Sequence, residues 1–398
     1  MSDDFILKDI LSAYQIVVCF LLICKRKRQP FRIASLNVRW DSRIPDPNFL
    51  SQKQRVPDIL EKSRCLLDQK SNVEIPNPDV LMFQEVHESC LEYFRKFAEH
   101  NCLEIRFGMY NNKKKLFFVT LTSLPIVRSS LKRVPKGFEC SLGTTVVKNG
   151  TEIEVFNIHL PLDASNCGQK VVATKFVSDL ASGTKKHVEN PNWMDVCEHQ
   201  LRLWFLSFYR RSIIAGDWNT LMENSIGTTT QITEAHRRGM VDVSSSNPGS
   251  FFAFIDSATR SFALSAVFYH IFEKYLSPDI PATNFYGLIF LSLTAVMVWT
   301  RLYNNCDVFN NCWNFWGYPI EVDRLQGPQK NLLLDRCAVS PGVRCFKFGT
   351  LSEFLEISCK DTETESFPVS DHLRIFFEGD VGLSFAGSVV RWIAQNFF

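Results

Sequence analysis

Several common signatures of function are missing from this sequence, and each absence excludes a class of protein. No glycine-rich phosphate loop is present, so the usual nucleotide-binding motifs are excluded and we expect no organic cofactor. The 13 cysteines are scattered and odd in number, without zinc-finger spacing. This pattern argues against a disulfide framework or a zinc site, and it favours reduced thiols in a reducing compartment. No serine–histidine or cysteine–histidine spacing indicates a nucleophilic enzyme.

Net charge is also nearly absent, since 44 lysines and arginines face 42 aspartates and glutamates. Bulk electrostatic attraction to nucleic acid is therefore not expected. The charge is unevenly distributed, however, with compact basic runs at residues 25–28 and 113–115. Either run could contact phosphate or an anionic membrane. For residues 113–115, a simple solvated surface is the preferred interpretation.

Residues 1–29 combine an apolar run, residues 10–24, with the first basic cluster. The run is short for a spanning helix, which needs about 20 residues. Acids precede the run and bases follow it, so as an anchor it would leave the next domain in the cytosol. The alternative is a helix or strand that packs on the domain. We expect an intracellular protein, cytosolic or nuclear, with membrane attachment through this run as an open alternative.

The composition changes again at residues 251–316, which are rich in aromatic residues and poor in charge. Residues 285–300 contain no charge and form a slightly short membrane-helix candidate. The alternatives are a buried hairpin or helix of an insertion, or extra sequence from a mistaken gene assignment. We therefore predict one catalytic domain over residues 30–380, interrupted by this insertion. Residues 381–398 form an amphipathic tail that packs on the domain or lies on a membrane surface.

Apolar periodicity predicts the elements of the catalytic domain. Strands are expected at residues 31–37, 79–86, 103–108, 116–121, 126–134, 143–147 and 151–159, and again at 212–217, 331–339 and 373–377. Helices are expected at residues 51–69, 168–181, 194–211 and 231–238.

The most informative stretch is the apolar run at residues 212–216, which ends in a glycine and is followed by Asp217 and Asn219. Alternate residues of an extended chain point the same way, so these two side chains should face one site. A carboxylate that takes a proton from water, beside an amide that holds the water or a phosphate oxygen, suits hydrolysis. The competing interpretation is a strand that ends in a polar turn.

Other apolar runs also end in polar residues. Asn37 closes the first strand, and Glu85 follows a buried run, where it could bind Mg²⁺ or cap the next helix. His159 ends another strand, although a lone histidine is more often structural. Asp335 lies within a buried run, and an Asp-His pair at 371–372 precedes the last strand. Strand ends that meet at one sheet edge would form a hydrolytic site for phosphate esters.

Six short motifs in this order resemble the endonuclease/exonuclease/phosphatase superfamily, the deoxyribonuclease-I-like fold. They are Leu36-Asn37, Gln84-Glu85, Asn157-Ile158-His159-Leu160, Gly216-Asp217-Trp218-Asn219, Leu334-Asp335 and Ser370-Asp371-His372. The resemblance implies an α/β fold: a four-layered α/β sandwich of two packed mixed β-sheets flanked by helices, with the site at one rim. Trp218 and Arg336 depart from the usual pattern without removing a catalytic group.

The resemblance also implies a metal site. Glu85 would bind Mg²⁺, or Mn²⁺ in its place, with Asn37 beside it. Asp371 would complete the metal or histidine shell.

Five further residues take catalytic roles by resemblance. Asp217 would orient or deprotonate the attacking water, and Asn219 would hold a phosphate oxygen. His159 and His372 would stabilise charge in the transition state, and Asp335 would orient His372.

Three substrates remain open. The closing motif at residues 367–372 and the segments at 214–217 and 241–243 are similar to the tyrosyl-DNA phosphodiesterase branch, so nucleic acid is the first expectation. The apolar segments and the tail favour a membrane-associated neutral sphingomyelinase-like enzyme instead. A phosphoinositide phosphatase has the least support. The non-enzyme alternative is a membrane-tethered scaffold with a decayed site.

Overall fold

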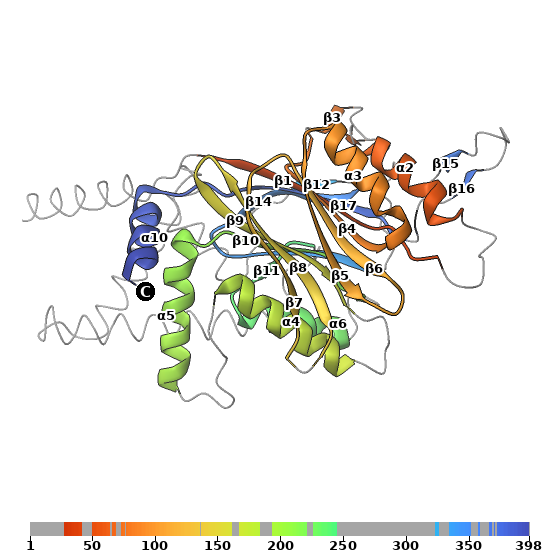
Figure 1. Cartoon of the computed structure of the whole chain (residues 1–398). Helices are drawn as coiled ribbons and strands as arrows, with labels where there is room; N and C mark the ends of the chain where they lie inside the picture. The colour runs from red at the N-terminus through yellow and green to blue at the C-terminus, as the bar shows by residue number, and fades with distance from the viewer. Residues whose placement is uncertain are drawn as a thin grey trace, which may run out of the picture.

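A computed structural model describes most of the predicted catalytic domain (Figure 1). The described residues are 28–41, 50–63, 66–68, 73–75, 77–135, 137–160, 167–183, 193–220, 226–244, 323–325, 334–351, 357–358, 366–367, 370 and 372–397. The predicted apolar segments at 10–24 and 285–300, the insertion at 251–316 and Asp371 lie outside them. Across the described residues, no helix has the length and apolar character needed to span a membrane.

The first sheet has seven strands in the order β12-β14-β17-β1-β4-β6-β5. They are β1 (Pro30–Asn37), β4 (Val80–His87), β5 (Glu104–Asn111), β6 (Leu116–Thr122), β12 (Asp323–Leu325), β14 (Arg344–Leu351) and β17 (Arg374–Asp380). The central strand β1 runs parallel to β4 and antiparallel to β17.

The second sheet has six strands in the order β11-β13-β10-β9-β8-β7. They are β7 (Ile126–Arg133), β8 (Glu139–Lys148), β9 (Thr151–His159), β10 (Ser212–Asp217), β11 (Val241–Asp242) and β13 (Asp335–Val339). Here β10 is parallel to β9 and antiparallel to β13. Two small ribbons pair β2 (Leu66–Asp68) with β3 (Val73–Ile75), and β15 (Ile357–Ser358) with β16 (Ser366–Phe367).

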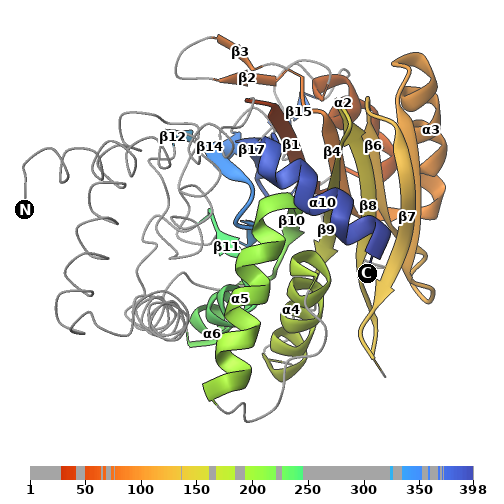
Figure 2. The same cartoon turned by 90° about the vertical axis from the view of Figure 1, so that its left-hand side faces the viewer.

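Helices cover the outer faces of both sheets (Figures 1 and 2). The first sheet carries α2 (Gln52–Lys62), the short 3-10 turn η1 (Glu88–Cys90) and α3 (Leu91–His100). The second carries α4 (Cys167–Ser182) and α6 (Ile226–Arg237), beside α5 (Trp193–Tyr209) and α10 (Phe385–Phe397). The arrangement confirms the expected α/β sandwich of two mixed sheets flanked by helices.

Three buried clusters correspond to the three interfaces between these layers. One lies between the two sheets and includes Phe31, Met82 and Ile213. The others lie beneath α2 and α3, and beneath α4 and α6. In β1, Ile33 belongs to the inter-sheet cluster and Leu36 to the helix side, so both faces are covered. Burial on both faces also explains the continuous apolar runs Val80–Phe83 of β4 and Ile213–Ala215 of β10.

The helix expected at residues 51–69 is shorter than predicted, because α2 ends at Lys62. The hydroxyl of Ser63 donates to the carbonyl of Ile59 at 2.6 Å, and it accepts from the guanidinium of Arg374 at 2.7 Å. A buried hydroxyl used in this way satisfies the last turn and the sheet together. The chain then continues into β2.

Candidate active site

The polar strand ends converge at one rim of the sandwich. In the second sheet, the register pairs Asp217 with His159 on one side and with Asp335 on the other. In the first sheet, Asn37 at the end of β1 pairs with Gln84 of β4. Because β1, β4, β9 and β10 end at the same edge, their terminal side chains meet, as the sequence predicted.

Two direct contacts join the sheets at this rim. The Nδ2 of Asn37 donates to Oδ2 of Asp217 at 2.9 Å. The Nε2 of His159 lies 3.0 Å from Oε1 of Glu85 and 3.5 Å from Oδ2 of Asp217. The Oδ1 of Asn37 accepts the backbone N–H of Arg39 at 2.9 Å, which fixes the orientation of the amide. The predicted residues of both sheets thus form a single cluster.

A buried polar bridge beneath the rim sets the spacing of the two sheets. The Nε2 of Gln84 donates to Oδ1 of Asn157 at 2.6 Å and to Oγ of Ser35 at 2.9 Å. The Nδ2 of Asn157 donates across to the carbonyls of Phe83 and Val119, both at 3.1 Å. Both polar atoms of the Asn157 amide are bonded, whereas Oε1 of Gln84 is buried without a hydrogen-bond partner. The bonds of Asn157 and of Gln84 Nε2 link strands of the two sheets and so favour one arrangement of the surrounding backbone.

Gly216 lies beside this bridge with φ of +136°, a conformation essentially confined to glycine. A Cβ at this position would lie 2.3 Å from the carbonyl oxygen of Ile158 and 3.1 Å from Nε2 of Gln84. The glycine is therefore needed for the close approach of β10 to β9, immediately before Asp217.

Asp217 and Asn219 lie together as predicted, but they are not alternate residues of one extended strand. β10 ends at Asp217, and Asn219 adopts a left-handed conformation with φ of +50°. The Asn219 backbone N–H donates to Oδ1 of Asp217 at 2.8 Å, and its Nδ2 donates to Oδ2 at 3.2 Å. Nδ2 also donates to the carbonyl of Leu160, and the Asn219 carbonyl accepts from Nζ of Lys170 at 2.9 Å. The Asn219 amide thus positions Asp217.

Glu85 reaches the site through a β-bulge. Its φ is +57°, and the pairing of β4 with β6 shifts register between Phe83 and Val86. A bulge of this kind re-aims a side chain, here toward the other sheet. The backbone N–H of Trp40 donates to Oε2 of Glu85 at 2.6 Å. Burial raises the pKa of Glu85, but the bonded, charged His159 and the Trp40 N–H outweigh it and lower that pKa to about 2.

The pKa values of Asp217 and His159 are both raised. Burial raises the pKa of Asp217 above its ordinary value, and the nearby charges of His372 and His159 offset only part of that effect. Burial disfavours charge on His159, but the Glu85 bond and the charge of Asp217 outweigh it, so its pKa is raised. A carboxylate with a raised pKa is a better proton acceptor, as a general base requires.

His372 is oriented by Asp335. Its Nδ1 lies 2.8 Å from Oδ2 of Asp335, so its Nε2 faces Nδ2 of Asn37 at 3.4 Å and Oδ2 of Asp217 at 3.8 Å. Ser370 holds this loop, since its hydroxyl donates to the carbonyl of Asn37 at 2.6 Å and accepts the His372 N–H at 3.2 Å. The Asp335 carboxylate is thus placed where it can fix the tautomer of the His372 imidazole.

The donor set fits a divalent cation. Two groups, Glu85–His159–Asp217 and Asp217–Asp335–His372, have potential ligand atoms within 4.8 Å of one another. The Oδ1 of Asp335 is buried and has no hydrogen-bond partner in the structure. Clustered carboxylate oxygens with an unsatisfied buried member are suited to a hard cation such as Mg²⁺.

Three residues near the site were not predicted from the sequence. Lys170 and Trp40 bond to Asn219 and Glu85, as described above. The third is Tyr110, whose ring centroid lies 5.1 Å from that of His159. Burial, followed by the charges of Glu85 and Asp217, raises the pKa of the Tyr110 hydroxyl well above its ordinary value. The only sequence signal for Tyr110 is its position near the end of a strand, which is weak by itself.

Comparison with known proteins gives a direct result. The sequence profile of the Endonuclease/Exonuclease/phosphatase family matches residues 34–372. The chain belongs to this family. The endonuclease/exonuclease/phosphatase match starts within β1 and ends at His372, so it spans every predicted site residue: Asn37, Glu85, His159, Asp217, Asn219, Asp335, Asp371 and His372.

Solved structures of the endonuclease/exonuclease/phosphatase family are similar at low sequence identity. A family member from Bacteroides thetaiotaomicron has 11% identity and a TM-score of 0.48, with 89% of this chain and 99% of that chain covered. TDP2 of Caenorhabditis elegans, truncated, has 13% identity and a TM-score of 0.43, covering 88% and 97%. A mannosyl-6-phosphatase from B. thetaiotaomicron has 11% identity and a TM-score of 0.46, covering 88% and 99%. No curated protein sequence matches the chain.

Members of the endonuclease/exonuclease/phosphatase family are hydrolases that act on phosphate esters, generally with a divalent metal. The site of this chain brings together seven of the eight predicted residues, and the eighth, Asp371, lies outside the described residues.

Proposed function

We propose that the protein is an Mg²⁺-dependent phosphodiesterase that hydrolyses phosphodiester bonds in nucleic acid. The observation that carries this proposal is the network at the rim, in which Asn37 and His372 converge on Asp217 beside the ionised Glu85. We propose residues 30–380 as the catalytic domain, located in the cytosol or the nucleus.

The residues of the chain divide the chemistry among them. Asp217, with its raised pKa, orients the attacking water and accepts its proton. Asn37 and Asn219 hold the Asp217 carboxylate in place. His372, oriented by Asp335, and His159 supply positive charge toward the phosphoryl oxygens. Phosphoryl transfer depends mainly on such positioning and charge neutralisation.

A bound Mg²⁺ or Mn²⁺ would neutralise charge on the phosphate group. Glu85 is the first ligand we assign, with Asn37 beside it, and the resemblance assigns Asp371 to the same metal or histidine shell. The buried, unbonded oxygen of Asp335 makes that carboxylate a second candidate ligand.

An aromatic and basic surface beside Glu85 favours nucleic acid over other phosphate esters. Trp40, whose N–H bonds to Glu85, lies under Lys114, with Nζ 4.1 Å from the ring centroid. Lys114 and its exposed neighbours Lys113 and Lys115 form the turn between β5 and β6. An aromatic ring next to lysines is suited to a base and its phosphates. The basic run, for which a solvated surface was the preferred interpretation, therefore lies beside Trp40 and Glu85 of the proposed site.

Removing this charge should weaken substrate binding without impairing chemistry. We expect Lys113→Ala/Lys114→Ala to raise KM for a single-stranded oligonucleotide and to leave kcat nearly unchanged. The slope of log(kcat/KM) against log salt should fall by about 1.4, at roughly 0.7 per lost phosphate contact. Lys96→Ala, an exposed lysine on α3, is the matched control. An unchanged salt slope in the double variant would indicate that these lysines are solvated and do not contact the substrate.

The proposed function is tested by a substrate panel. The full chain would be assayed with Mg²⁺, and with EDTA, on a 5′-tyrosyl oligonucleotide, a plain single-stranded oligonucleotide, sphingomyelin micelles and a soluble phosphoinositide. We expect metal-dependent cleavage of an oligonucleotide. Turnover of sphingomyelin alone would replace the proposal with a neutral sphingomyelinase-like activity, and phosphoinositide turnover alone with a phosphatase. No turnover of any substrate would favour the membrane-tethered scaffold.

A further inference from the structure

The C-terminal helix α10 presents large apolar side chains to solvent. The exposed fractions are 68% for Phe385, 58% for Trp392, 41% for Ile393 and 40% for Val389. Their spacing of four, three and one residues places them on one face of the helix. Exposed apolar side chains clustered in this way indicate an interaction surface.

The opposite face of α10 holds the helix on the domain through small residues. Gly387 is packed so closely that a Cβ would lie 2.5 Å from the carbonyl oxygen of Phe208 on α5. The hydroxyl of Ser384 accepts the Gly387 N–H at 3.0 Å. Figure 2 shows α10 lying across α5. The helix is therefore docked by its small residues and turns its bulky apolar residues outward.

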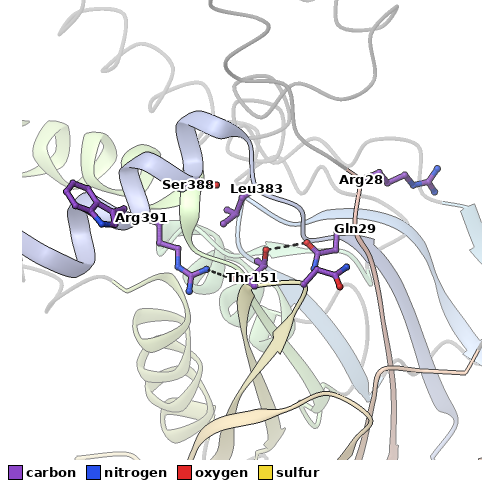
Figure 3. A pocket seen from close by; sticks show the side chains of 9 residues that line it. Arg28, Gln29, Thr151, Leu383, Ser388 and Arg391 are labelled. Atoms are coloured by element: carbon purple, nitrogen blue, oxygen red, sulfur yellow. Dashed lines mark hydrogen bonds between the residues drawn. The ribbon is translucent and has the colours of Figure 1, made fainter.

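A basic and polar cavity adjoins this apolar face (Figure 3). It has a volume of about 610 Å³, and Arg28, Thr151, Ser388, Arg391 and Trp392 are among the residues that line it. Arg391 pairs with Glu152 at 2.8 Å and donates to the carbonyl of Gly150 at 3.2 Å, so its charge is largely balanced.

Arg28 is the second source of positive charge at this cavity. It is exposed, and its guanidinium lies 4.4 Å from the ring centroid of Phe346, which Arg344 also approaches at 5.2 Å. Arg28 is directly preceded by Lys25-Arg26-Lys27. The cavity is thus bordered by apolar and cationic groups together.

We propose that this surface, defined by Phe385, Val389, Trp392, Ile393 and Arg28, docks on a bilayer that contains anionic phospholipid. The apolar side chains of α10 enter the boundary between headgroups and acyl chains, with Trp392 at the level it prefers. Arg28 attracts the negative headgroups, whose phosphates fit the polar cavity. The combination of a cationic border with an apolar helix face favours this partner over a second protein copy.

The position of the docking surface has a consequence for the substrate. Arg28 precedes β1, whereas Asn37 ends it. β1 has eight residues, which at about 3.3 Å per residue separates its ends by roughly 23 Å. A protein docked through α10 and Arg28 therefore holds its catalytic rim away from the lipid. Such an orientation leaves the rim open to a soluble polyanion and does not suit hydrolysis of lipid in the same bilayer.

The test is co-sedimentation of the full chain with vesicles of phosphatidylcholine, with and without phosphatidylserine. We expect binding only to the mixed vesicles, weakened by salt, and reduced about tenfold or more in Phe385→Ser/Trp392→Ser. Val172→Ser, an exposed apolar residue of α4, should bind as the unsubstituted chain does. Thermal unfolding of each variant confirms that the exposed substitutions leave the fold intact.

Three outcomes would overturn the proposal. Equal binding to both kinds of vesicle would exclude recognition of anionic lipid. Unchanged binding in the double variant would show that another segment attaches the protein, and a dimer in solution that Phe385→Ser/Trp392→Ser dissociates would identify a second copy as the occupant. None of these readouts depends on hydrolysis, so this proposal is tested independently of the proposed function.

Discussion

Asp217→Asn is expected to lower kcat on nucleic acid by on the order of 10³-fold, within the range typical of general acid–base catalysis. The Asp217 carboxylate accepts from Nδ2 of Asn37 and from the backbone N–H and Nδ2 of Asn219. An amide at this position keeps the shape but has one acceptor oxygen instead of two, and its NH₂ faces other donors. It also cannot accept a proton from water, and it removes the negative charge that faces His159 and His372.

The measurement is steady-state kinetics on the preferred oligonucleotide, with thermal unfolding of each variant. Asp58→Asn on the outer helix α2 makes the same chemical change far from the rim, and it should retain full activity. A substituted enzyme with normal kcat and an altered KM would show that Asp217 binds substrate and does not act in the chemical step.

Gly216→Ala is expected to destabilise the fold by about 3 to 5 kcal/mol, which is at the high end for single substitutions. The backbone conformation at φ of +136° contributes about 1 to 3 kcal/mol for a residue with a side chain. The remainder comes from the new Cβ, 2.3 Å from the Ile158 carbonyl oxygen, which can be relieved only by moving β9 away from β10. Because His159 and Asp217 follow directly, activity should fall as well.

Gly150→Ala separates the cost of the backbone conformation from the cost of the steric contact. Gly150 also has positive φ, +77°, but no atom lies within 4 Å of the position a Cβ would take. Its cost should be only about 1 kcal/mol. Denaturant unfolding of the two variants measures both effects. Equal losses of stability would mean that the β9–β10 contact is not a steric constraint and that backbone conformation alone explains the glycine.

The sequence was sufficient to predict the central strands and most of the rim. Asp217, Glu85 and His159 each follow an apolar run, and strands buried on both faces have few other ways to pair. The sandwich followed from the six ordered motifs, which together identify the family although each is short. Asp335 was expected inside a strand, whereas β13 begins at Asp335 and so places this carboxylate at the same edge.

Other features depended on partners that local sequence does not reveal. The bulge that turns Glu85 into the site arises from the pairing of β4 with β6, across more than thirty residues of chain. Lys170 of helix α4 donates a hydrogen bond to the Asn219 carbonyl. Lys114, in the turn between β5 and β6, contacts the ring of Trp40. The contacts of the Asn219 amide with Leu160 and Asp217 were also not predictable from local sequence, and its expected contact with a phosphate oxygen stays a prediction.

The pairing of β1 with β17 also determines when the first sheet can be completed. Pro30 pairs with Asp380, so β1, the central strand of the first sheet, completes its ladder with a strand made some 350 residues later. Contacts between such distant segments slow folding, because a long loop must close before they stabilise anything. During synthesis, β1 and β4 therefore emerge long before β17, with one edge of β1 unpaired. The ladder between β1 and β17 forms only after the last strand has been translated.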